Sequence, residues 1–321
     1  MNVIITGVAG FIGSNLAKKL LEEGHRVTGI DNLSYGSLSN IKSFEGNKNF
    51  TFIEGNVKDE QPLFKLKGDF LVHLASQKIP RYTSALITLD ENSTMLKNVV
   101  KKCLADKIKL VFASTSDIYG KNPDIPYKET SNILLGPTTV KRWAYAISKI
   151  YSEQYIIANN SDHDLTYTIM RFFGSYGPNQ NLTWWGGPQS VFIANALVNK
   201  PLEIHGDGLQ TRTFTYIEDT VQGIVKSIFE EKAKNEIFNI ANNPSEEITI
   251  LGLGEMIWKL IHGNNAKPLI NFIPYATFGN YEDVKRRVPD ISKIKSMLGY
   301  DPHFSLSEGM NKTIEWQKNL S

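Results

Sequence analysis

Cysteine is almost absent from the chain: of 321 residues only Cys103 is one, which excludes an intramolecular disulfide. The sequence also lacks an apolar run of about 18 residues, the length of a membrane-spanning helix, so we expect no membrane contact. A strong charge of one sign is missing too: 35 Lys and Arg face 33 Asp and Glu, and a net charge of +2 excludes a protein that mainly coats nucleic acid. No basic leader precedes the strand-like residues after Met1, so we expect a cytoplasmic protein that acts on a small molecule.

The residues that are present are typical of a globular protein. Hydrophobic residues make up 41% of the chain and charged residues 21%, and the 24 Gly and 13 Pro are spread along it. This composition excludes disordered, collagen-like and solenoid chains. Because the length exceeds the ~100–200 residues of one average domain, we expect either one large α/β unit or two domains that share a cleft.

Short β-branched runs alternate with longer amphipathic segments through the first half of the chain. This alternation predicts βαβ units and an α/β fold with a doubly wound parallel sheet. We expect strands at Asn2–Thr6, Arg26–Asp31, Phe50–Glu54, Phe70–Leu74, Lys109–Ser114 and Thr166–Arg171. We expect helices at Phe11–Glu23, Ser84–Ala105 and Ala144–Asn159.

The pattern changes after Arg171, where turn-forming glycines and prolines separate shorter, mixed elements. We therefore expect a Rossmann-type domain over residues 1–172, with a return of residues 217–241 to it. Residues 173–321 would form a smaller mixed α/β domain that binds the substrate.

A glycine-rich loop follows the first predicted strand and opens the first predicted helix. Gly7, Gly10 and Gly13 have the spacing G-x-x-G-x-x-G, which lets backbone N–H groups approach a pyrophosphate at the helix N-terminus. The glycines alone would also fit an ordinary close-packed turn, but Asp31 ends the second strand 18 residues beyond Gly13. A carboxylate there accepts hydrogen bonds from a ribose and repels a 2′-phosphate, which predicts NAD rather than NADP. A basic residue brought in with the loop of residues 32–39 would reverse this choice.

Tyr145 and Lys149 lie four residues apart, on one face of the third predicted helix. In this arrangement the Lys charge can lower the pKa of the Tyr hydroxyl and hold the nicotinamide ribose, so that the Tyr moves a proton. Such a pair also occurs by chance on solvated helices. The end of the fifth predicted strand adds Thr115, Ser116 and Asp117, which supply hydroxyls and a carboxylate.

With the glycine loop, these segments resemble the extended short-chain dehydrogenase/reductase family, in particular its nucleotide-sugar epimerases, dehydratases and decarboxylases. Further segments that resemble the family are His73–Ser76, Arg171–Pro178, Gly206–Phe214 and Arg287–Ile291. The sequence departs from the family at Gly174, where an Asn is usual, and at Asp117, where dehydratases and decarboxylases have Glu.

The resemblance implies NAD as cofactor, a UDP-linked sugar as substrate and no metal. The implied cofactor-binding residues are Gly7, Gly10, Phe11, Ile12, Gly13, Asp31, Asn32, Leu74, Ala75, Asn92, Tyr145 and Lys149. The implied catalytic residues are Thr115, Ser116, Asp117, Tyr145 and Lys149. The implied substrate-binding residues are Lys78, Arg81, Gln210, Arg212, Tyr281 and Arg287. The resemblance also implies a homodimer, paired through residues 84–105 and 144–159.

Family enzymes oxidise the 4-hydroxyl of the sugar to a ketone, and they differ in what happens to that ketone. Because Asp117 is one methylene shorter than Glu, its carboxylate is retracted by about 1.5 Å, which favours a UDP-sugar 4-epimerase of the UDP-glucose type. A UDP-glucuronate-type decarboxylase is the alternative, favoured by Arg287 and by the segment around Arg142, and a 4,6-dehydratase comes third. A non-catalytic NAD-binding regulator is a remote fourth, since Thr115, Tyr145 and Lys149 are all present.

Overall fold

The computed structural model describes residues 1–78 and 84–320. In this part of the chain a seven-stranded parallel sheet has the order β11-β6-β5-β4-β1-β2-β3. The strands are β1 (Asn2–Thr6), β2 (Arg26–Asp31), β3 (Phe50–Glu54), β4 (Phe70–His73), β5 (Lys109–Thr115), β6 (Tyr167–Phe172) and β11 (Glu236–Ile240). The predicted doubly wound parallel sheet is confirmed, and the six predicted strands agree to within one residue at each end.

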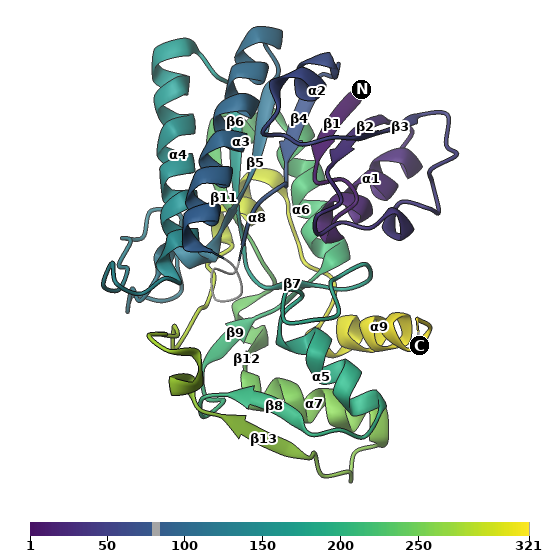
Figure 1. The fold of residues 1–321 in the computed structure, drawn as a ribbon, viewed down its shortest axis with the longest axis vertical. Helices are drawn as coiled ribbons and strands as arrows, with labels where there is room; N and C mark the ends of the chain where they lie inside the picture. The colour runs from purple at the N-terminus through teal and green to yellow at the C-terminus, as the bar shows by residue number, and fades with distance from the viewer. Residues whose placement is uncertain (79–83, 321) are drawn as a thin grey trace.

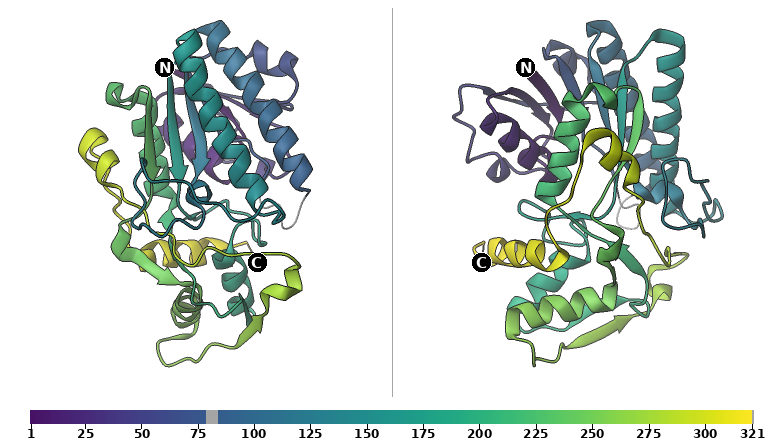
Figure 2. Two further views of the ribbon diagram at one scale, coloured as in Figure 1. Left: turned by 90° about the vertical axis from the view of Figure 1, so that its left-hand side faces the viewer. Right: turned by 180° about the vertical axis from the view of Figure 1, so that it is seen from behind.

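Helices cover both faces of this sheet. On one face α3 (Ala85–Asp106) packs against α4 (Trp143–His163) and the short α2 (Glu60–Lys65). On the other face α1 (Phe11–Glu22) packs against α6 (Ile217–Phe229). Figure 1 shows the two layers on either side of the sheet, and Figure 2 shows them from the side and from behind. The inner strands are apolar on both sides because helices bury both faces, as Val3, Ile4 and Ile5 show.

Residues from the second half of the chain complete the large sheet. After α6 the chain enters β11, which pairs in parallel with β6 at the sheet edge. The helix α8 (Ser292–Leu298) then packs on β11, so this late segment lies with the large sheet and not with the smaller domain.

The smaller domain lies below the carboxyl ends of the large sheet in Figure 1. It contains three two-stranded sheets and the helices α5, α7 and α9. Their bounds are β7 (Ser175–Tyr176), α5 (Pro188–Leu197), β8 (Leu202–His205), β9 (Thr211–Thr213), β10 (Thr215–Tyr216), β12 (Glu247–Thr249), α7 (Ile250–His262), β13 (Ile270–Ile273) and α9 (Leu306–Lys318). One continuous apolar cluster joins Val3 and Val72 of the large sheet to Phe192 and Leu253 of the smaller domain, so the two domains share a core.

A buried ion pair holds the middle of the large sheet to α4. Arg171 on β6 donates to both carboxylate oxygens of Glu153 on α4, from Nε at 3.0 Å and from Nη2 at 2.6 Å. Both side chains are 6% exposed, and Ser114 on β5 also donates to Glu153. The pair therefore fixes β5, β6 and α4 relative to one another.

The outer face of α3 and α4 carries apolar side chains without cover in the monomer: Leu86, Ile87, Ile147 and Tyr151 are 39–66% exposed. No helix in residues 1–78 or 84–320 has the length and apolar character needed to cross a membrane. We propose that a second copy of the chain covers this face, because contiguous exposed apolar patches favour association.

Light scattering at micromolar concentration should therefore give twice the chain mass of 36.1 kDa. The double variant Ile147→Arg and Tyr151→Arg should give the monomer mass, because two like-charged faces would repel each other across the two-fold axis. Phe272→Arg on β13, where the side chain is 50% exposed, is the matched control and should keep the dimer. A monomeric wild-type protein would show the proposal to be wrong.

Candidate active site

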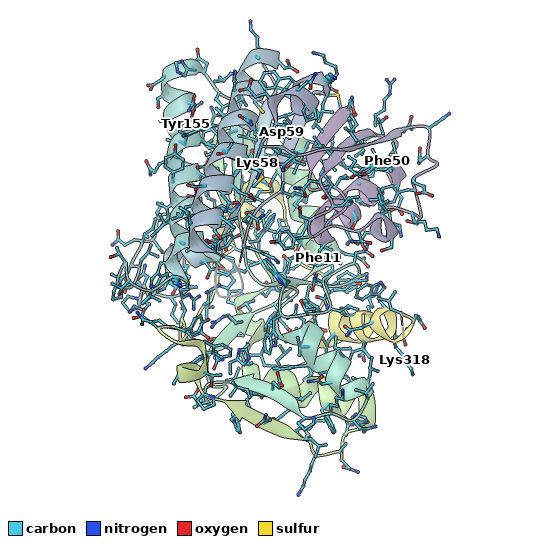
Figure 3. The ribbon with its side chains drawn as sticks, in the orientation of Figure 1. Phe11, Phe50, Lys58, Asp59, Tyr155 and Lys318 are labelled. Carbon is cyan, nitrogen blue, oxygen red and sulfur yellow. The ribbon has the colours of Figure 1, made fainter. Side chains whose placement is uncertain are left out.

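A cavity of about 970 Å³ lies between the carboxyl ends of the large sheet and the smaller domain. Both domains line it, and it has the position at which open parallel sheets bind ligands. Figure 3 labels Phe11, which begins α1 and lies in the middle of the molecule, between the sheet and the smaller domain. The volume is at the upper end of the range for ligand sites, which suits more than one small molecule.

The glycine loop forms one wall of this cavity. Gly7 has φ of +75°, and a Cβ on it would lie 2.9 Å from the backbone nitrogen of Ala75. A Cβ on Gly13 would lie 2.1 Å from the carbonyl oxygen of Gly7, so only glycine lets α1 pack this closely on the strand. Among the described residues no side chain caps α1, so its N-terminal N–H groups can donate hydrogen bonds to an anion.

Asp31 lies at the same wall, 7% exposed, at the end of β2. Its carboxylate accepts hydrogen bonds from the N–H groups of Ala9 at 3.0 Å and Leu33 at 2.8 Å. Burial raises the pKa of Asp31, while these backbone hydrogen bonds oppose the shift. The loop of residues 32–39 contains no Lys or Arg. The site therefore fits NAD. The glycines and the N-terminus of α1 would hold the pyrophosphate, and the Asp31 carboxylate, with no basic residue in that loop, would accept hydrogen bonds from the ribose hydroxyls.

Four of the predicted catalytic residues line the same cavity: Thr115, Asp117, Tyr145 and Lys149. Lys149 on α4 is 3% exposed and donates to the carbonyl oxygen of Ala113 at 2.8 Å. Its Nζ lies 5.8 Å from the ring centre of Tyr145, and Thr115 at the end of β5 lines the same part of the cavity. Burial lowers the pKa of Lys149 to about 7, and Glu153 opposes this shift.

The expected lowering of the Tyr145 pKa is not found in the structure. Burial raises the pKa of Tyr145, and the charge of Asp117 raises it further, although hydrogen bonds with Ser76 and Thr115 lower it. Sequence reasoning considered Lys149 alone and had no means to place Asp117 beside the phenol.

Two residues predicted for the site, Asn92 and Ser116, are not among the residues that line the cavity. Asn92 was expected at the cofactor, but its side chain donates to the Gln77 carbonyl at 2.9 Å and to Ser148 at 3.0 Å, and it accepts from the Gln77 N–H at 2.8 Å. It ties the segment after β4 to α4 and is not among the residues that line the cavity. Ser116 was expected to be catalytic, but it is 2% exposed and its hydroxyl faces Arg287 at 3.4 Å.

Asp117 lies at the centre of a group of arginines. Its Oδ1 accepts from Arg287 Nη2 at 2.6 Å and from Arg142 Nη2 at 3.2 Å. The charges of Arg287, Arg142 and Arg212 lower the pKa of Asp117 although burial opposes them. Asp117 is therefore a fully ionised acceptor near neutral pH and cannot donate a proton there.

A second carboxylate, that of Asp283, pairs with two of these arginines. Asp283 accepts from Arg142 at 2.9 Å, from Arg212 at 2.8 Å and from the hydroxyl of Tyr275 at 2.8 Å. Arg212 and Arg142 lower the pKa of Asp283 far below its usual range. Three arginines and two aspartates thus form what we call the arginine cluster, whose formal charge is +1.

The remaining predicted substrate residues are distributed as follows. Lys78, Gln210 and Tyr281 line the cavity, and Arg81 lies outside the described residues. Gln210 is buried and donates to the carbonyl oxygen of His205 at 3.1 Å.

Gly174, which departs from the family pattern, has φ of +50°, and a Cβ there would lie 3.0 Å from the Thr213 carbonyl. Within residues 1–78 and 84–320, no group of His, Cys, Asp and Glu could hold a metal ion.

Three residues of the site were not predicted as site residues from the sequence: Arg142, Asp283 and Tyr275. Arg142 lies in a segment that the sequence already associates with a decarboxylase, so a signal for it existed. Tyr275 had none, because its contact with Asp283 depends on the turn of residues 275–278 in the smaller domain.

Comparison with known proteins places the chain among nucleotide-sugar enzymes. Residues 3–241 match the NAD dependent epimerase/dehydratase family. The chain belongs to this family. As a member of it, the protein is an NAD-dependent enzyme, and the predictions of the family, the cofactor and the enzyme class are confirmed.

Three relatives show the range of reactions in the family. UDP-N-acetyl-alpha-D-glucosaminuronate decarboxylase of Bacillus cytotoxicus is 33% identical over 99% of this chain and 98% of its own. UDP-glucuronic acid decarboxylase 1 of Danio rerio is 33% identical over 98% of this chain and 72% of its own. The crystal structure of UDP-glucuronic acid 4-epimerase from Bacillus cereus is 28% identical, has a TM-score of 0.88 and covers both chains fully.

Lys149 gives a testable pH dependence. Its charge is present below about pH 7 and is lost as the pH rises through that value, because burial lowers its pKa. We expect kcat/KM to fall about tenfold per pH unit above this point if the charged form is the active one. Lys149→Arg should move this fall to higher pH, because a guanidinium stays protonated throughout. An unchanged fall near pH 7 in Lys149→Arg would contradict the assignment.

Proposed function

We propose that the protein decarboxylates a UDP-linked uronic acid by way of a 4-keto sugar. The observation that carries this proposal is the arginine cluster, which lies beside Tyr145 and Thr115 in the cavity. In the part of the chain that the structure describes, Arg142, Arg212 and Arg287 pair with two carboxylates, those of Asp117 and Asp283.

Charge balance is the physical reason. The cluster is largely buried, with side-chain exposures of 12–26%, and a net charge in such a place is costly unless it is compensated. A sugar carboxylate brings the one negative charge that is missing, and guanidinium groups bind carboxylates in a planar, two-bond geometry. A neutral hexose would leave the cluster with an uncompensated charge. The cluster therefore supports a uronate better than a hexose.

The catalytic residues fit the first half of such a reaction. Tyr145, with Thr115 beside it, would take the proton of the sugar 4-hydroxyl, and the charge of Lys149 would favour the tyrosinate. Bound NAD supplies the acceptor and later the donor of the hydride at carbon 4. Gly7, Gly13 and Asp31 would hold the cofactor, and Gln210 would hold the nucleotide part of the substrate.

The second half of the reaction is the loss of the sugar carboxylate from the 4-keto intermediate. Once carbon 4 is a ketone, the C5–C6 bond breaks, carbon dioxide leaves, and the electron pair forms an enolate whose oxygen is at carbon 4. The Tyr145 hydroxyl, protonated in the first half, can donate a hydrogen bond to that oxygen. Water then gives a proton to carbon 5, which restores the ketone, and the Tyr145 proton passes to oxygen 4 when the hydride returns to carbon 4. Asp117 is ionised and held by two arginines, so it would position Arg287 and not act as an acid. A 4,6-dehydratase, which needs an additional acid and base, is less well supported.

The relatives support the decarboxylase alternative over the 4-epimerase that sequence analysis placed first. The two curated relatives described above are decarboxylases of UDP-uronates. A UDP-uronate 4-epimerase is the second candidate, because the structural relative from Bacillus cereus acts on a substrate that also carries a carboxylate.

Product analysis by NMR separates these candidates. We expect UDP-glucuronate, or its 2-N-acetyl analogue, to lose carbon 6 and give a UDP-pentose with release of carbon dioxide. Tyr145→Phe should lower this rate by about 10²–10⁴-fold, the usual cost of losing a general acid or base. Inversion at carbon 4 with the carboxylate retained would favour the second candidate, and turnover of neutral UDP-hexoses alone would overturn both.

Arg287→Met tests the role of the arginine cluster directly. We expect it to weaken binding of the UDP-uronate to the NAD-loaded enzyme roughly 10- to 100-fold, since a hydrogen bond to a charged group contributes about 1.5–3 kcal/mol. Binding of UDP-glucose, which has no carboxylate, should change by less than about threefold, and calorimetry measures both.

Arg286→Met is the matched control for this variant. Arg286 is 56% exposed and pairs with Glu247, outside the residues that line the cavity, so its loss should change neither affinity. Equal weakening of both sugars by Arg287→Met would count against carboxylate recognition.

A further inference from the structure

Two aromatic side chains meet across the cavity from opposite domains. Tyr35, in the loop after β2, lies with its ring centre 4.6 Å from that of Trp185, in the loop before α5, at an interplanar angle of 35°. Both residues line the cavity, together with Asn32 and Ser34 on one side and Gly186 on the other. The contact therefore connects the loop that follows Asp31 to the smaller domain.

The loop of Tyr35 is held firmly on the large domain. The Leu33 N–H donates to Asp31 at 2.8 Å, and the Ser37 N–H donates to the carbonyl oxygen of Ala9 at 3.0 Å. The side chain of Asn40 donates to the same carbonyl at 2.9 Å. Tyr35 thus projects from a short loop that is tied at both ends to the residues around Asp31 and the glycine loop.

The loop of Trp185 is held equally firmly on the smaller domain. The ring of the preceding residue, Trp184, stacks on His205 with ring centres 4.0 Å apart, and it packs edge-on against Phe192. Gln189, at the start of α5, donates to the carbonyl oxygen of Gly186 at 2.7 Å. The two adjacent tryptophans therefore have different contacts: Trp184 packs within the smaller domain, and Trp185 contacts Tyr35.

The Tyr35 ring has no other stacking partner among the described residues. Its side chain remains 47% exposed in spite of the contact, which a ring buried for core packing would not be. Among the described residues, the ring that it meets belongs to the other domain, and Asp31 lines the same cavity. A contact this exposed contributes little to packing of the hydrophobic core. It connects the two walls of the cavity between which a dinucleotide has to enter and leave.

We propose that Tyr35 and Trp185 form an aromatic clasp that retains NAD on the enzyme. The two rings have to separate for the adenosine end of NAD to leave, so the stacking energy adds to the barrier for release. This inference rests on NAD as the cofactor and on the contact between the two domains. It is independent of the reaction that the enzyme catalyses.

Release of NAD from the loaded enzyme tests the clasp. The enzyme is saturated with isotopically labelled NAD, separated from free cofactor and chased with excess unlabelled NAD. Tyr35→Ala and Trp185→Ala should each release the label about 2- to 10-fold faster, the change that corresponds to the ~0.5–1.5 kcal/mol of an aromatic pair. The double variant should release NAD no faster than the faster single variant, because either change breaks the same contact.

Three controls separate the clasp from a general loss of structure. Tyr35→Phe and Trp185→Phe keep the rings and should retain NAD as the wild type does. Phe272→Ala removes a half-exposed ring from β13, away from the cavity, and should leave release unchanged. Unchanged release in the alanine variants, or effects that add in the double variant, would overturn the proposal. Neither result depends on which UDP-sugar the enzyme uses, so a failure of the proposed function remains distinguishable.

Discussion

The pairing of Arg171 with Glu153 is the interaction on which the active site depends. Two oppositely charged side chains, each 6% exposed, lie in the interior between β6 and α4, and neither charge could stay there alone. Removing one partner of such a pair typically costs about 3–5 kcal/mol, because the other charge remains buried. The pair also contacts Ser114, one residue before Thr115, and Glu153 is one helical turn from Lys149. The relative positions of the catalytic strand and the catalytic helix thus follow from one ion pair.

Further hydrogen bonds connect the same pair to the segment that carries Arg287. Arg171 donates to the Tyr119 hydroxyl at 2.9 Å, and Tyr119 donates to Asn239 on β11 at 2.7 Å. Asn239 in turn donates to the Asp290 carbonyl at 3.0 Å, three residues beyond Arg287 in sequence. Because each polar group along this path has a partner, the segment that carries Arg287 is fixed relative to the sheet.

The arginine cluster joins selection of the substrate to the arrangement of the domains. Arg142 and Asp117 come from the large domain, whereas Arg212 and Asp283 come from the segments around the smaller one. A group that neutralises the extra positive charge would therefore also strengthen the contact between the domains. Binding of the substrate carboxylate would then also hold the two domains together at the sugar end of the cavity. At the other end of the cavity an uncharged ring contact links the same two domains.

The sequence by itself determined the parallel sheet, the phosphate loop and the catalytic spacing, because each depends on residues close together in the chain. Alternation of β-branched and amphipathic segments predicted six strands, and the positions of Gly7, Gly13 and Asp31 predicted the cofactor. The role of Asp117 was decided only by the tertiary structure. Its partners Arg142 and Arg287 lie 25 and 170 residues away, and no local pattern shows whether a carboxylate is free to move a proton or held as a counter-ion. Long-range contacts likewise join Asn92 to Gln77 and Ser148 and bring Tyr35 to Trp185, since burial and charge act through space and not along the chain.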